Sequence, residues 1–279
     1  MIMVKNPRVA ILILNYRQPN LTVSCVKSVL ENTYQNYKVF LIDNHSQDDS
    51  KEIFLKEFDH HPQIKLLQTK ANFGYGGGNN YAAREALKRG SFDYFCILNN
   101  DTLVDKNFLK TLINSCKILG KENIYFPLIL SWQTNVVQNG GLKDFLPTPF
   151  QFNHSGKEAK TKFRTEALPF LGGCCFLVKA SIFQKAGGFR EDFFMYTEDV
   201  DFGIRAKRSG IKLYLIPKSK IWHKGSSSFS PSSIYYMARN TMYLIRERSD
   251  RKKCDYLRAC FWFTLIAVMN FFLADFKSL

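Results

Sequence analysis

Four short apolar runs near the N-terminus end abruptly in polar residues, and helical segments separate them. Their length and their content of β-branched and aromatic residues predict buried strands. Alternating strands and helices are typical of a parallel sheet with helices on its faces. We therefore predict an α/β fold in which the carboxyl ends of the strands form a ligand-binding edge. The predicted strands are residues 8–14, 37–42, 64–68 and 92–98, and the predicted helices are 19–31, 48–58 and a third that ends near Arg89. Later in the chain we predict a strand and a hairpin within 121–141, and further strands over 170–178 and 212–216.

The fourth run ends in two amides and a carboxylate, Asn99, Asn100 and Asp101. A carboxylate at the end of a buried strand is well placed to meet a ligand. The same residues also fit a strand-to-helix turn, in which Asp101 or Thr102 caps a segment that begins near Lys106. Both interpretations stay open at this point.

A second acidic group lies much later in the chain, at Glu198, Asp199 and Asp201. Carboxylates this close repel one another and raise each other's pKa values, so the group costs stability unless a cation compensates. A divalent metal with phosphate ligands, together with a proton-accepting carboxylate, would account for both acidic groups. The alternative is a solvated first helical turn, with Arg205 one turn below Asp201.

A glycine-rich stretch follows the third predicted strand, from Gly74 to Gly78, and Asn79 and Asn80 come next. A dinucleotide-binding fingerprint needs its glycines directly after the first strand, and it needs a glycine where Asn79 stands. The poor match argues against a nicotinamide or flavin site. The stretch still permits close backbone approach to a ligand, or a tight turn that packs a helix on the sheet.

The charge balance indicates an anionic partner. Lys and Arg number 39 against 24 Asp and Glu in 279 residues, a formal net charge of +15. Nucleotide diphosphates, lipid headgroups and nucleic acids would all suit this excess, although a solubilising surface would look the same. The basic residues are scattered and no helix-turn-helix or zinc pattern appears, so we expect no nucleic-acid binding. Seven cysteines without a CxxC pair indicate reduced thiols in a cytoplasmic protein.

The two ends of the chain differ. The first apolar run is too short for a signal peptide. Residues 259–274 are almost wholly apolar but slightly short for a membrane span, which favours a buried or interfacial helix. Basic residues before this run suit an anionic membrane surface, whereas a packing helix or a contact within a homo-oligomer fits equally well. These basic residues are Arg246, Arg248, Arg251, Lys252, Lys253 and Arg258.

Further short motifs follow one another in a fixed order. They are Ile13-Leu14-Asn15-Tyr16, Ile42-Asp43-Asn44-His45-Ser46, Asn72-Phe73-Gly74, Leu98-Asn99-Asn100-Asp101, Gly172-Gly173, Gly187-Gly188-Phe189, the segment 194–201, Arg205 and His223. In this order they resemble family 2 of the inverting glycosyltransferases, which have the GT-A fold. The resemblance covers about residues 9–246 and is strongest to the rhamnosyltransferase-like branch, which builds bacterial surface polysaccharides.

The resemblance implies a nucleotide-sugar site. Asp43 would accept a hydrogen bond from the pyrimidine base, and Asn15 would line the same pocket with the loop from Asn72 to Gly74. Arg239, in a later helix, would contact phosphate or acceptor, although a surface position on that helix fits it as well.

The resemblance also implies a metal and a base. Asn99, Asn100 and Asp101 stand where the family has its Asp-x-Asp metal motif, with Asn99 in place of the first carboxylate. Asp101 and His223 would then bind Mg²⁺ or Mn²⁺ held chiefly by substrate phosphates. Asp199 would be the general base. Glu198 is the second candidate for that role, or would orient the acceptor.

These roles define the expected enzyme and its parts. We expect an inverting transferase that uses dTDP-rhamnose, or alternatively a UDP-sugar, and adds one or a few residues to a saccharide or lipid-linked acceptor at the cytoplasmic membrane face. A scaffold without catalytic activity is the remaining alternative. The expected domains are a catalytic domain, 1–230, with a nucleotide-sugar half (1–120) and an acceptor half (121–230), and a helical tail, 231–279. The polar segment 143–165 is expected to be a lid or acceptor loop.

Overall fold

The structure is a computed structural model that describes most of the chain. Side chains are described as far as residue 268. The described residues are 6–144, 146, 152, 154–225, 230–247 and 253–275.

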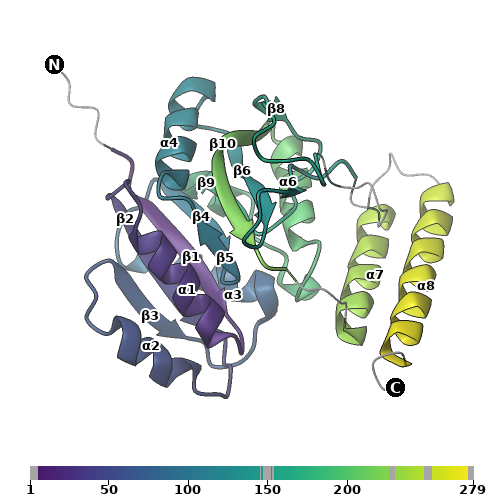
Figure 1. Cartoon of the computed structure of the whole chain (residues 1–279), viewed down its shortest axis with the longest axis horizontal. Coiled ribbons are helices and arrows are strands. Elements are labelled where there is room, and N and C mark those ends of the chain that lie inside the picture. The colour runs from purple at the N-terminus through teal and green to yellow at the C-terminus, as the bar shows by residue number, and fades with distance from the viewer. Residues whose placement is uncertain are drawn as a thin grey trace.

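The first part of the chain builds the predicted parallel sheet. Strand β1 pairs in parallel with β2 on one side and with β4 on the other, and β3 pairs with β2. The connecting helices pack against this sheet (Figure 1). The elements are β1 (Val9–Asn15), α1 (Pro19–Leu30), β2 (Tyr37–Asp43), α2 (Ser50–Phe58), β3 (Ile64–Gln68), α3 (Gly74–Lys88) and β4 (Tyr94–Asn99).

The later strands extend the same sheet. Its order is β3-β2-β1-β4-β9-β6-β10-β5, with β7 paired to β6 and β8 paired to β10. Strand β9 runs antiparallel to β4 and joins the two parts. The further elements are β5 (Thr102–Val104), α4 (Phe108–Leu119), β6 (Ile124–Ser131), β7 (Val137–Asn139), β8 (Glu166–Ala167), β9 (Cys175–Lys179), α5 (Ala180–Lys185), the 3-10 helix η1 (Glu191–Phe193), α6 (Glu198–Arg208), β10 (Leu213–His223), α7 (Pro231–Arg246) and α8 (Lys253–Asp275).

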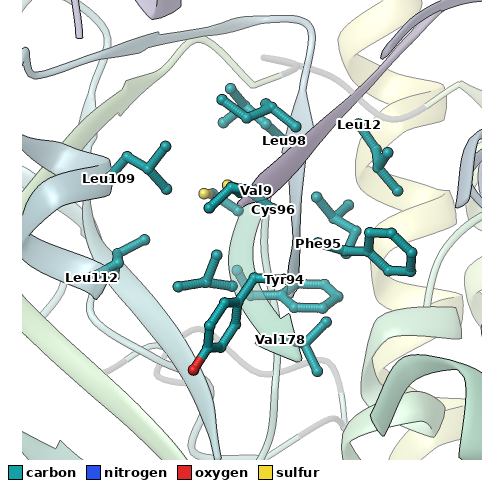
Figure 2. Close-up of a cluster of buried hydrophobic side chains, with 14 of the residues drawn as sticks. Val9, Leu12, Tyr94, Phe95, Cys96, Leu98, Leu109, Leu112 and Val178 are labelled. Carbon is teal, nitrogen blue, oxygen red and sulfur yellow. The ribbon is translucent and has the colours of Figure 1, made fainter. Parts of the chain in front are cut away.

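The core lies on both faces of the sheet. Every residue of β1 is buried, as expected for a central strand of a covered parallel sheet. Side chains of β1, β4 and β9 meet Leu109 and Leu112 of α4 in one cluster (Figure 2). A group of aromatic rings, with centroids 5.2–6.1 Å apart, fixes α6 and its acidic first turn against the sheet. These rings belong to Phe176, Phe183, Phe189 and Phe202.

The helices α7 and α8 lie side by side at one end of the molecule (Figure 1). A second hydrophobic cluster joins them to α6 and to the loop before it. Within the described ranges, no helix is both long enough and apolar enough to cross a membrane. The domain boundaries at residues 120 and 230 remain predictions. The second cluster contains Phe193, Val200, Ile204, Leu244, Ile245, Ala259 and Phe263, together with Leu142 and Leu146.

The glycine stretch differs from the expectation. We expected a glycine-rich segment through Asn80 followed by a helix, but α3 already begins at Gly74. A side chain at Gly78 would place its Cβ 2.5 Å from Leu14 Cδ1. The glycines therefore let the first turns of α3 lie very close to β1, which is the packing alternative stated above.

Strand β10 is longer than the late strand expected from the pattern, because it continues past Pro217 to His223. A proline interrupts a ladder of hydrogen bonds, so the pattern indicated an end at Ile216. The register against β6 shifts between Ile216 and Lys220, and this irregularity accommodates the proline. The continuation pairs His223 with Thr102 of β5.

Two further segments can be compared with the predictions. The hairpin expected after residue 121 is present as β6 and β7. The strand expected over 170–178 begins only at Cys175, because Gly173 has a φ of +124°, which is not a strand conformation. Parts of the segment 143–165 lie outside the described residues.

Candidate active site

The carboxyl ends of β1, β2 and β3 form a buried polar group around Asp43. Asn15 stands opposite Asp43 in the parallel register, and its Nδ2 donates to Asp43 Oδ1 at 3.1 Å. Gln68, at the end of β3, donates from Nε2 to Asp43 Oδ2 at 3.1 Å, and the Ser46 hydroxyl donates to Oδ1. The carboxylate is thus held in one orientation. Sequence reasoning gave no role to Gln68, although its place at the end of a strand was a usable signal.

The loop before α3 is tied to the same edge. Asn44 donates from Nδ2 to Asn72 Oδ1 at 2.9 Å and to the Gly74 carbonyl at 3.1 Å. Gly74 has a φ of +69°, and a Cβ there would lie 2.2 Å from the Phe194 carbonyl oxygen. Glycine at this position therefore lets the start of α3 touch the loop that leads to the second acidic group.

The two amide side chains of the first acidic group, Asn99 and Asn100, form hydrogen bonds within the protein. Asn99 Oδ1 accepts from the Tyr75 hydroxyl at 2.8 Å, and Asn100 Nδ2 donates to Thr22 Oγ1 at 2.8 Å. The capping interpretation of this segment is wrong, because Thr102 opens strand β5 and α4 begins only at Phe108, after Asn107. Thr102 Oγ1 instead donates to the Asn99 carbonyl at 2.7 Å, within the turn between β4 and β5. These contacts leave Asp101 as the group that can serve a ligand.

Asp101 lies beside His223 as a consequence of the β5–β10 pairing. Its Oδ1 is buried, makes no hydrogen bond of good geometry, and lies 3.3 Å from His223 Nε2. Burial alone would raise the pKa of the Asp101 carboxyl, but His223 and nearby backbone N–H groups outweigh this effect and hold that pKa below its usual value. Asp101 is therefore ionised at neutral pH.

The other ring nitrogen of His223 fixes the orientation of the ring. Nδ1 lies 2.7 Å from Gln138 Oε1, and an amide oxygen only accepts, so Nδ1 carries a proton. With Nδ1 engaged in this way, Nε2 faces the Asp101 carboxylate. Two acceptors facing each other need a proton or a cation between them, and a histidine fixed through its far nitrogen is the usual arrangement of a metal ligand. The pair fits a divalent ion whose other ligands are phosphates and waters.

The described residues do not contain a complete metal cage. No group of three or more His, Cys, Asp or Glu side chains gathers within the described part of the chain. Asp101 and His223 can therefore supply two ligands, and the other ligands must come from substrate or solvent.

Residues 173 and 174 connect the second acidic group to the strand end that precedes Asp101. Asp199 Oδ2 accepts from the Gly173 N–H at 2.9 Å, and Oδ1 accepts from the Val200 N–H at 2.8 Å. The neighbouring Cys174 accepts, through its carbonyl, from the Asn99 N–H at 2.8 Å. Both carboxylates act on one thiol, since the pKa of Cys174 is raised first by burial and further by the charges of Asp101 and Asp199.

The two adjacent carboxyl groups differ in protonation. Burial raises the pKa of Asp199 to about 6, although the N–H groups of Gly173 and Val200 favour its charged form. The pKa of Glu198 is raised well above its usual range, first by burial and then by the Asp199 charge. Glu198 is 5% exposed, and its Oε2 has no hydrogen-bond partner, as is true of the buried Thr197 Oγ1. Glu198 is thus a neutral acid beside an ionised Asp199 at neutral pH.

Asp201 forms an ion pair within α6. Its Oδ2 accepts from Arg205 Nε at 2.7 Å, one turn along α6. The alternative interpretation of the acidic group is therefore correct in placing Arg205 one turn below Asp201. It is wrong in expecting a solvated turn, because Asp201 is 4% exposed.

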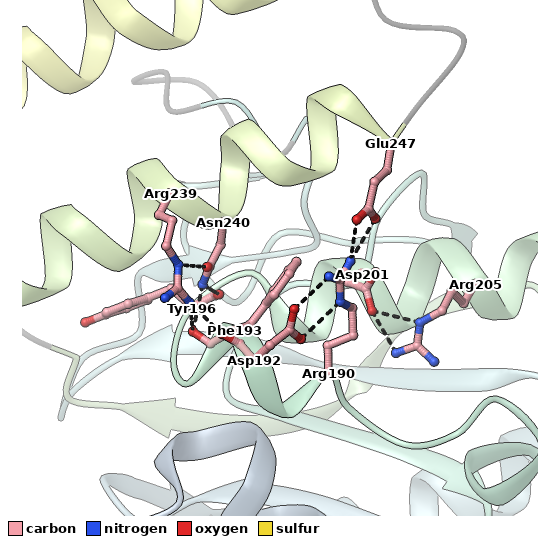
Figure 3. A network of polar contacts seen from close by, with 9 residues as sticks. All are labelled: Arg190, Asp192, Phe193, Tyr196, Asp201, Arg205, Arg239, Asn240 and Glu247. Atoms are coloured by element: carbon pink, nitrogen blue, oxygen red, sulfur yellow. Dashed lines mark hydrogen bonds and ion pairs between the residues drawn. The ribbon is translucent and has the colours of Figure 1, made fainter.

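Arg239 is committed to the loop before α6 (Figure 3). Its Nη2 donates to the carbonyls of Asp192 and Phe193 at 2.6 and 3.0 Å, and its Nε donates to Asn240 Oδ1 at 2.9 Å. Contact of Arg239 with phosphate or acceptor stays a prediction. Its neighbour Asn240 contacts the carbonyls of Phe193, Met195 and Tyr196 in the same loop.

The fold is shared with known transferases. Over 86% of this chain and 48% of the other, it superposes on GalNAc-T7 crystallised with UDP, GalNAc and Mn²⁺ at a TM-score of 0.66 and 17% identity. Over 91% of this chain and 70% of the other, it superposes on residues 1–349 of TarS from S. aureus at a TM-score of 0.59 and 14% identity. These likenesses establish the GT-A fold.

Sequence comparison defines the family. Residues 10–187 match the family Glycosyl transferase family 2, to which the chain belongs. It is 27% identical over 216 residues to the N-acetylglucosaminyl-diphospho-decaprenol L-rhamnosyltransferase of Mycobacterium tuberculosis, covering 70% of this chain and 69% of the relative. It is 24% identical over 242 residues to the rhamnosyltransferase WbbL of Escherichia coli K12, covering 80% and 89%. The chain spans about half, 53%, of the hexosyltransferase Agl10 of Haloferax volcanii, at 28% identity.

Replacing the buried acid Glu198 tests its protonation. The raised pKa means that the folded protein binds this proton more tightly than the unfolded chain does, so wild-type stability falls as the pH rises above the ordinary value of 4.5. Glu198→Gln does not titrate and escapes this loss. We expect its Tm to exceed that of the wild type by more at pH 8 than at pH 5, with about 2–4 °C per kcal/mol for a chain of this size.

Thermal unfolding at both pH values measures this difference. Glu52→Gln, at an exposed position on α2, is the matched control and should show the same small effect at each pH. A Tm difference for Glu198→Gln that does not change with pH would show that Glu198 is ionised in the folded protein.

Proposed function

We propose that this protein is a metal-dependent inverting glycosyltransferase that transfers a sugar from a nucleotide-sugar donor to a saccharide or lipid-linked acceptor. The observation that supports this most is that the ionised Asp101, beside His223, and the oriented Asp199 meet across residues 173 and 174. The rhamnosyltransferases among its relatives favour rhamnose carried by dTDP, with a UDP-sugar as the alternative. The decaprenol-linked acceptor named for the mycobacterial relative makes a lipid-linked acceptor the favoured class.

The donor base is assigned to the ends of β1 to β3. The Asp43 carboxylate is fixed by Asn15 and Gln68, so it is prepared to accept a hydrogen bond from the N–H of a pyrimidine. The Asn72 to Gly74 loop would lie along the same nucleoside. The close approach that Gly74 permits brings this loop to the acceptor half.

The diphosphate is assigned to Asp101 and His223. A divalent cation bound there would neutralise the negative charge that develops on the leaving nucleoside diphosphate. Asp101 contributes its buried, ionised oxygen to this position. Gln138 keeps the His223 ring in the tautomer that presents Nε2.

Asp199 is assigned as the general base. Its carboxylate would take the proton from an acceptor hydroxyl while that oxygen attacks the anomeric carbon and the bond from this carbon to the diphosphate oxygen breaks. A single displacement of this kind inverts the anomeric configuration. A pKa near 6 keeps the base ionised at neutral pH without making it too weak to accept a proton. Glu198, kept neutral by burial, can donate a hydrogen bond to the acceptor.

The helix α8 is assigned to a membrane surface. One of its faces is packed, with Ala259 and Phe263 buried in the second cluster. Its outer face exposes Leu257, Phe261 and Val268, at 72%, 63% and 45%, which lie on one stripe because they are four, seven and eleven positions apart. A helix with apolar side chains exposed to water and basic residues near its start suits the interface of an anionic bilayer. This would hold the enzyme at the cytoplasmic face, near a lipid-linked acceptor.

Loss of the Asp199 carboxylate should abolish transfer. We expect Asp199→Asn to lower kcat by at least about 100-fold, the contribution typical of a general base, while donor binding survives. In the wild type, kcat should fall about tenfold for each pH unit below 6, because the base must be ionised. Release of dTDP from dTDP-rhamnose, or of UDP from UDP-sugars, measures both. Asp59→Asn, distant on an exposed turn after α2, is the control. Undiminished turnover of Asp199→Asn would exclude Asp199 as base.

Nucleotide binding should depend on the metal through Asp101. Thermal shift with dTDP, UDP and GDP, each with and without Mn²⁺, should show a metal-dependent increase for a pyrimidine nucleotide. At about 100 Kd of ligand the stabilisation is about 2.7 kcal/mol. Asp101→Asn should lose the increase that Mn²⁺ causes and keep the smaller metal-independent shift. If Mn²⁺ raises the Tm of the variant as much as that of the wild type, the metal does not bind at Asp101.

The outer face of α8 should carry membrane binding. In sedimentation with vesicles of phosphatidylcholine and phosphatidylglycerol, Leu257→Ser with Phe261→Ser should reduce the partition coefficient at least about tenfold, since burying each apolar side chain contributes about 1.5–3 kcal/mol. Leu55→Ser, which changes a 42% exposed leucine on α2, is the matched control. Equal binding of wild type and double variant would remove α8 as the docking face.

A further inference from the structure

The segment that leads into the acidic turn of α6 has a strained backbone. Phe194, Tyr196 and Thr197 have φ values of 63°, 64° and 64°. Bulky and β-branched residues rarely adopt this left-handed conformation, because the side chain crowds the following carbonyl. Such a segment keeps its shape only when its surroundings impose it, and strain of this kind gathers at functional sites.

The contacts that impose the shape come chiefly from one side chain of α7, Asn240. It is fully buried, and its Nδ2 lies 2.9, 2.9 and 2.8 Å from the carbonyl oxygens of Phe193, Met195 and Tyr196 (Figure 3). Its own Oδ1 accepts from Arg239 Nε, and this bond orients the amide so that Nδ2 faces the three carbonyls. A single amide group thus gathers three carbonyls of the strained segment.

Other contacts hold the rest of the segment without replacing Asn240. The Tyr196 hydroxyl donates to or accepts from Ser233 Oγ at 3.1 Å, and Arg190 bridges Asp192 and Glu247 at 2.8 and 2.7 Å. On the opposite side, the Tyr75 N–H donates to the Phe194 carbonyl at 2.6 Å. Arg239 also donates to the carbonyls of Asp192 and Phe193. Asn240 adds the contacts to the carbonyls of Met195 and Tyr196, which lie nearest to α6.

The segment determines where Asp199 lies. Thr197 is the residue that precedes α6, and its carbonyl accepts from the Asp201 N–H at 2.9 Å in the first turn. The Asp199 carboxylate follows within that turn and must reach the Gly173 N–H. A change in the direction of the segment at Tyr196 would therefore move the carboxylate away from residue 173 and from the opposite Asp101.

We propose that Asn240 is a positioning residue for Asp199: its amide holds the carbonyls of Phe193, Met195 and Tyr196 so that the first turn of α6 presents the carboxylate to the reacting hydroxyl. This inference rests on the proposed function, because it takes Asp199 as the base. Asn240 itself touches neither donor nor acceptor in this scheme. Its effect is on the rate of the chemical step and leaves donor binding unchanged.

Asn240→Ala and the near-isosteric Asn240→Asp test the proposal. The second variant leaves no cavity and replaces the N–H groups by a carboxyl oxygen that, when ionised, cannot donate and repels the three carbonyls. A displacement of about 1 Å can cost about 100-fold in rate, so we expect kcat with dTDP-rhamnose or a UDP-sugar to fall at least about tenfold with KM for the donor unchanged. The pH at which kcat is half-maximal should also move, since the Asp199 carboxylate loses its fixed N–H partners. Asn123→Ala is the matched control, because its side chain also bridges backbone groups, at 2.9 and 3.1 Å, far from the site.

Hydrogen–deuterium exchange provides a readout that does not need activity. In both Asn240 variants, amides of residues 194–201 should exchange at least about tenfold faster, while those of β1 and β2 keep their rates. Unchanged exchange there, or a variant with full kcat and an unmoved pH profile, would overturn the proposal. A loss of stability equal to that of Asn123→Ala, with no change in kcat, would show a structural role alone. Wild-type protein that turns over no nucleotide sugar would instead refute the proposed function, whatever the exchange shows.

Discussion

The backbone N–H of Gly173 connects the two halves of the candidate site. It donates to Asp199 Oδ2, and the next residue, Cys174, accepts from the N–H of Asn99 through its carbonyl. One short segment therefore contacts both the strand end that precedes Asp101 and the first turn of α6. Because hydrogen bonds act only over short distances, this bridge fixes how far apart the two carboxylates can lie. Gly173 has a φ of +124°, which a residue with a side chain would rarely adopt.

The polar groups around this bridge are costly to bury. The described residues with buried side-chain atoms lacking a hydrogen-bond partner are Asn32, Asp101, Thr197 and Glu198, and three of these four lie at the candidate site. An unpaired buried polar atom destabilises a fold by about 1–3 kcal/mol. Their concentration here means that the fold has not optimised this region for stability, which is the usual condition of a site whose partners arrive with the substrate.

The fold class and the positions of most elements could be predicted because they depend on local pattern. The apolar runs around Val9, Tyr37 and Ile64 each became a strand within one or two residues of the expected ends. The same local reasoning placed Asp43 and Asp101 at strand ends. It failed at Pro217, where pairing with β6 and β5 carries β10 on to His223 in spite of the proline. Pairing with strands that are distant in the sequence therefore determines where β10 ends, and the residues around Pro217 carry no local signal for it.

The roles of side chains that act over long separations could not be predicted from the pattern. Gln138 and His223 meet through strands 85 positions apart, and Asn240 reaches carbonyls 44 to 47 positions earlier. A buried asparagine in a helix looks, in the sequence, like any other polar position on an amphipathic segment. The motif order supplied by the family resemblance placed Asp199 and His223 in one site, whereas composition and spacing alone left each with a structural alternative.

The two C-terminal helices pack closely on the part of the chain that carries Asp199. Helix α7, which begins just after the predicted boundary at residue 230, supplies Asn240, Leu244 and Ile245 to the loop and helix that carry this carboxylate. The opposite side of the same pair of helices exposes Leu257 and Phe261. Helix α8 packs on α7, and α7 contacts the segment that orients the Asp199 carboxylate. A membrane that binds α8 would therefore contact a helix pair that packs directly on this segment. The two C-terminal helices are thus part of the packing that shapes the candidate site.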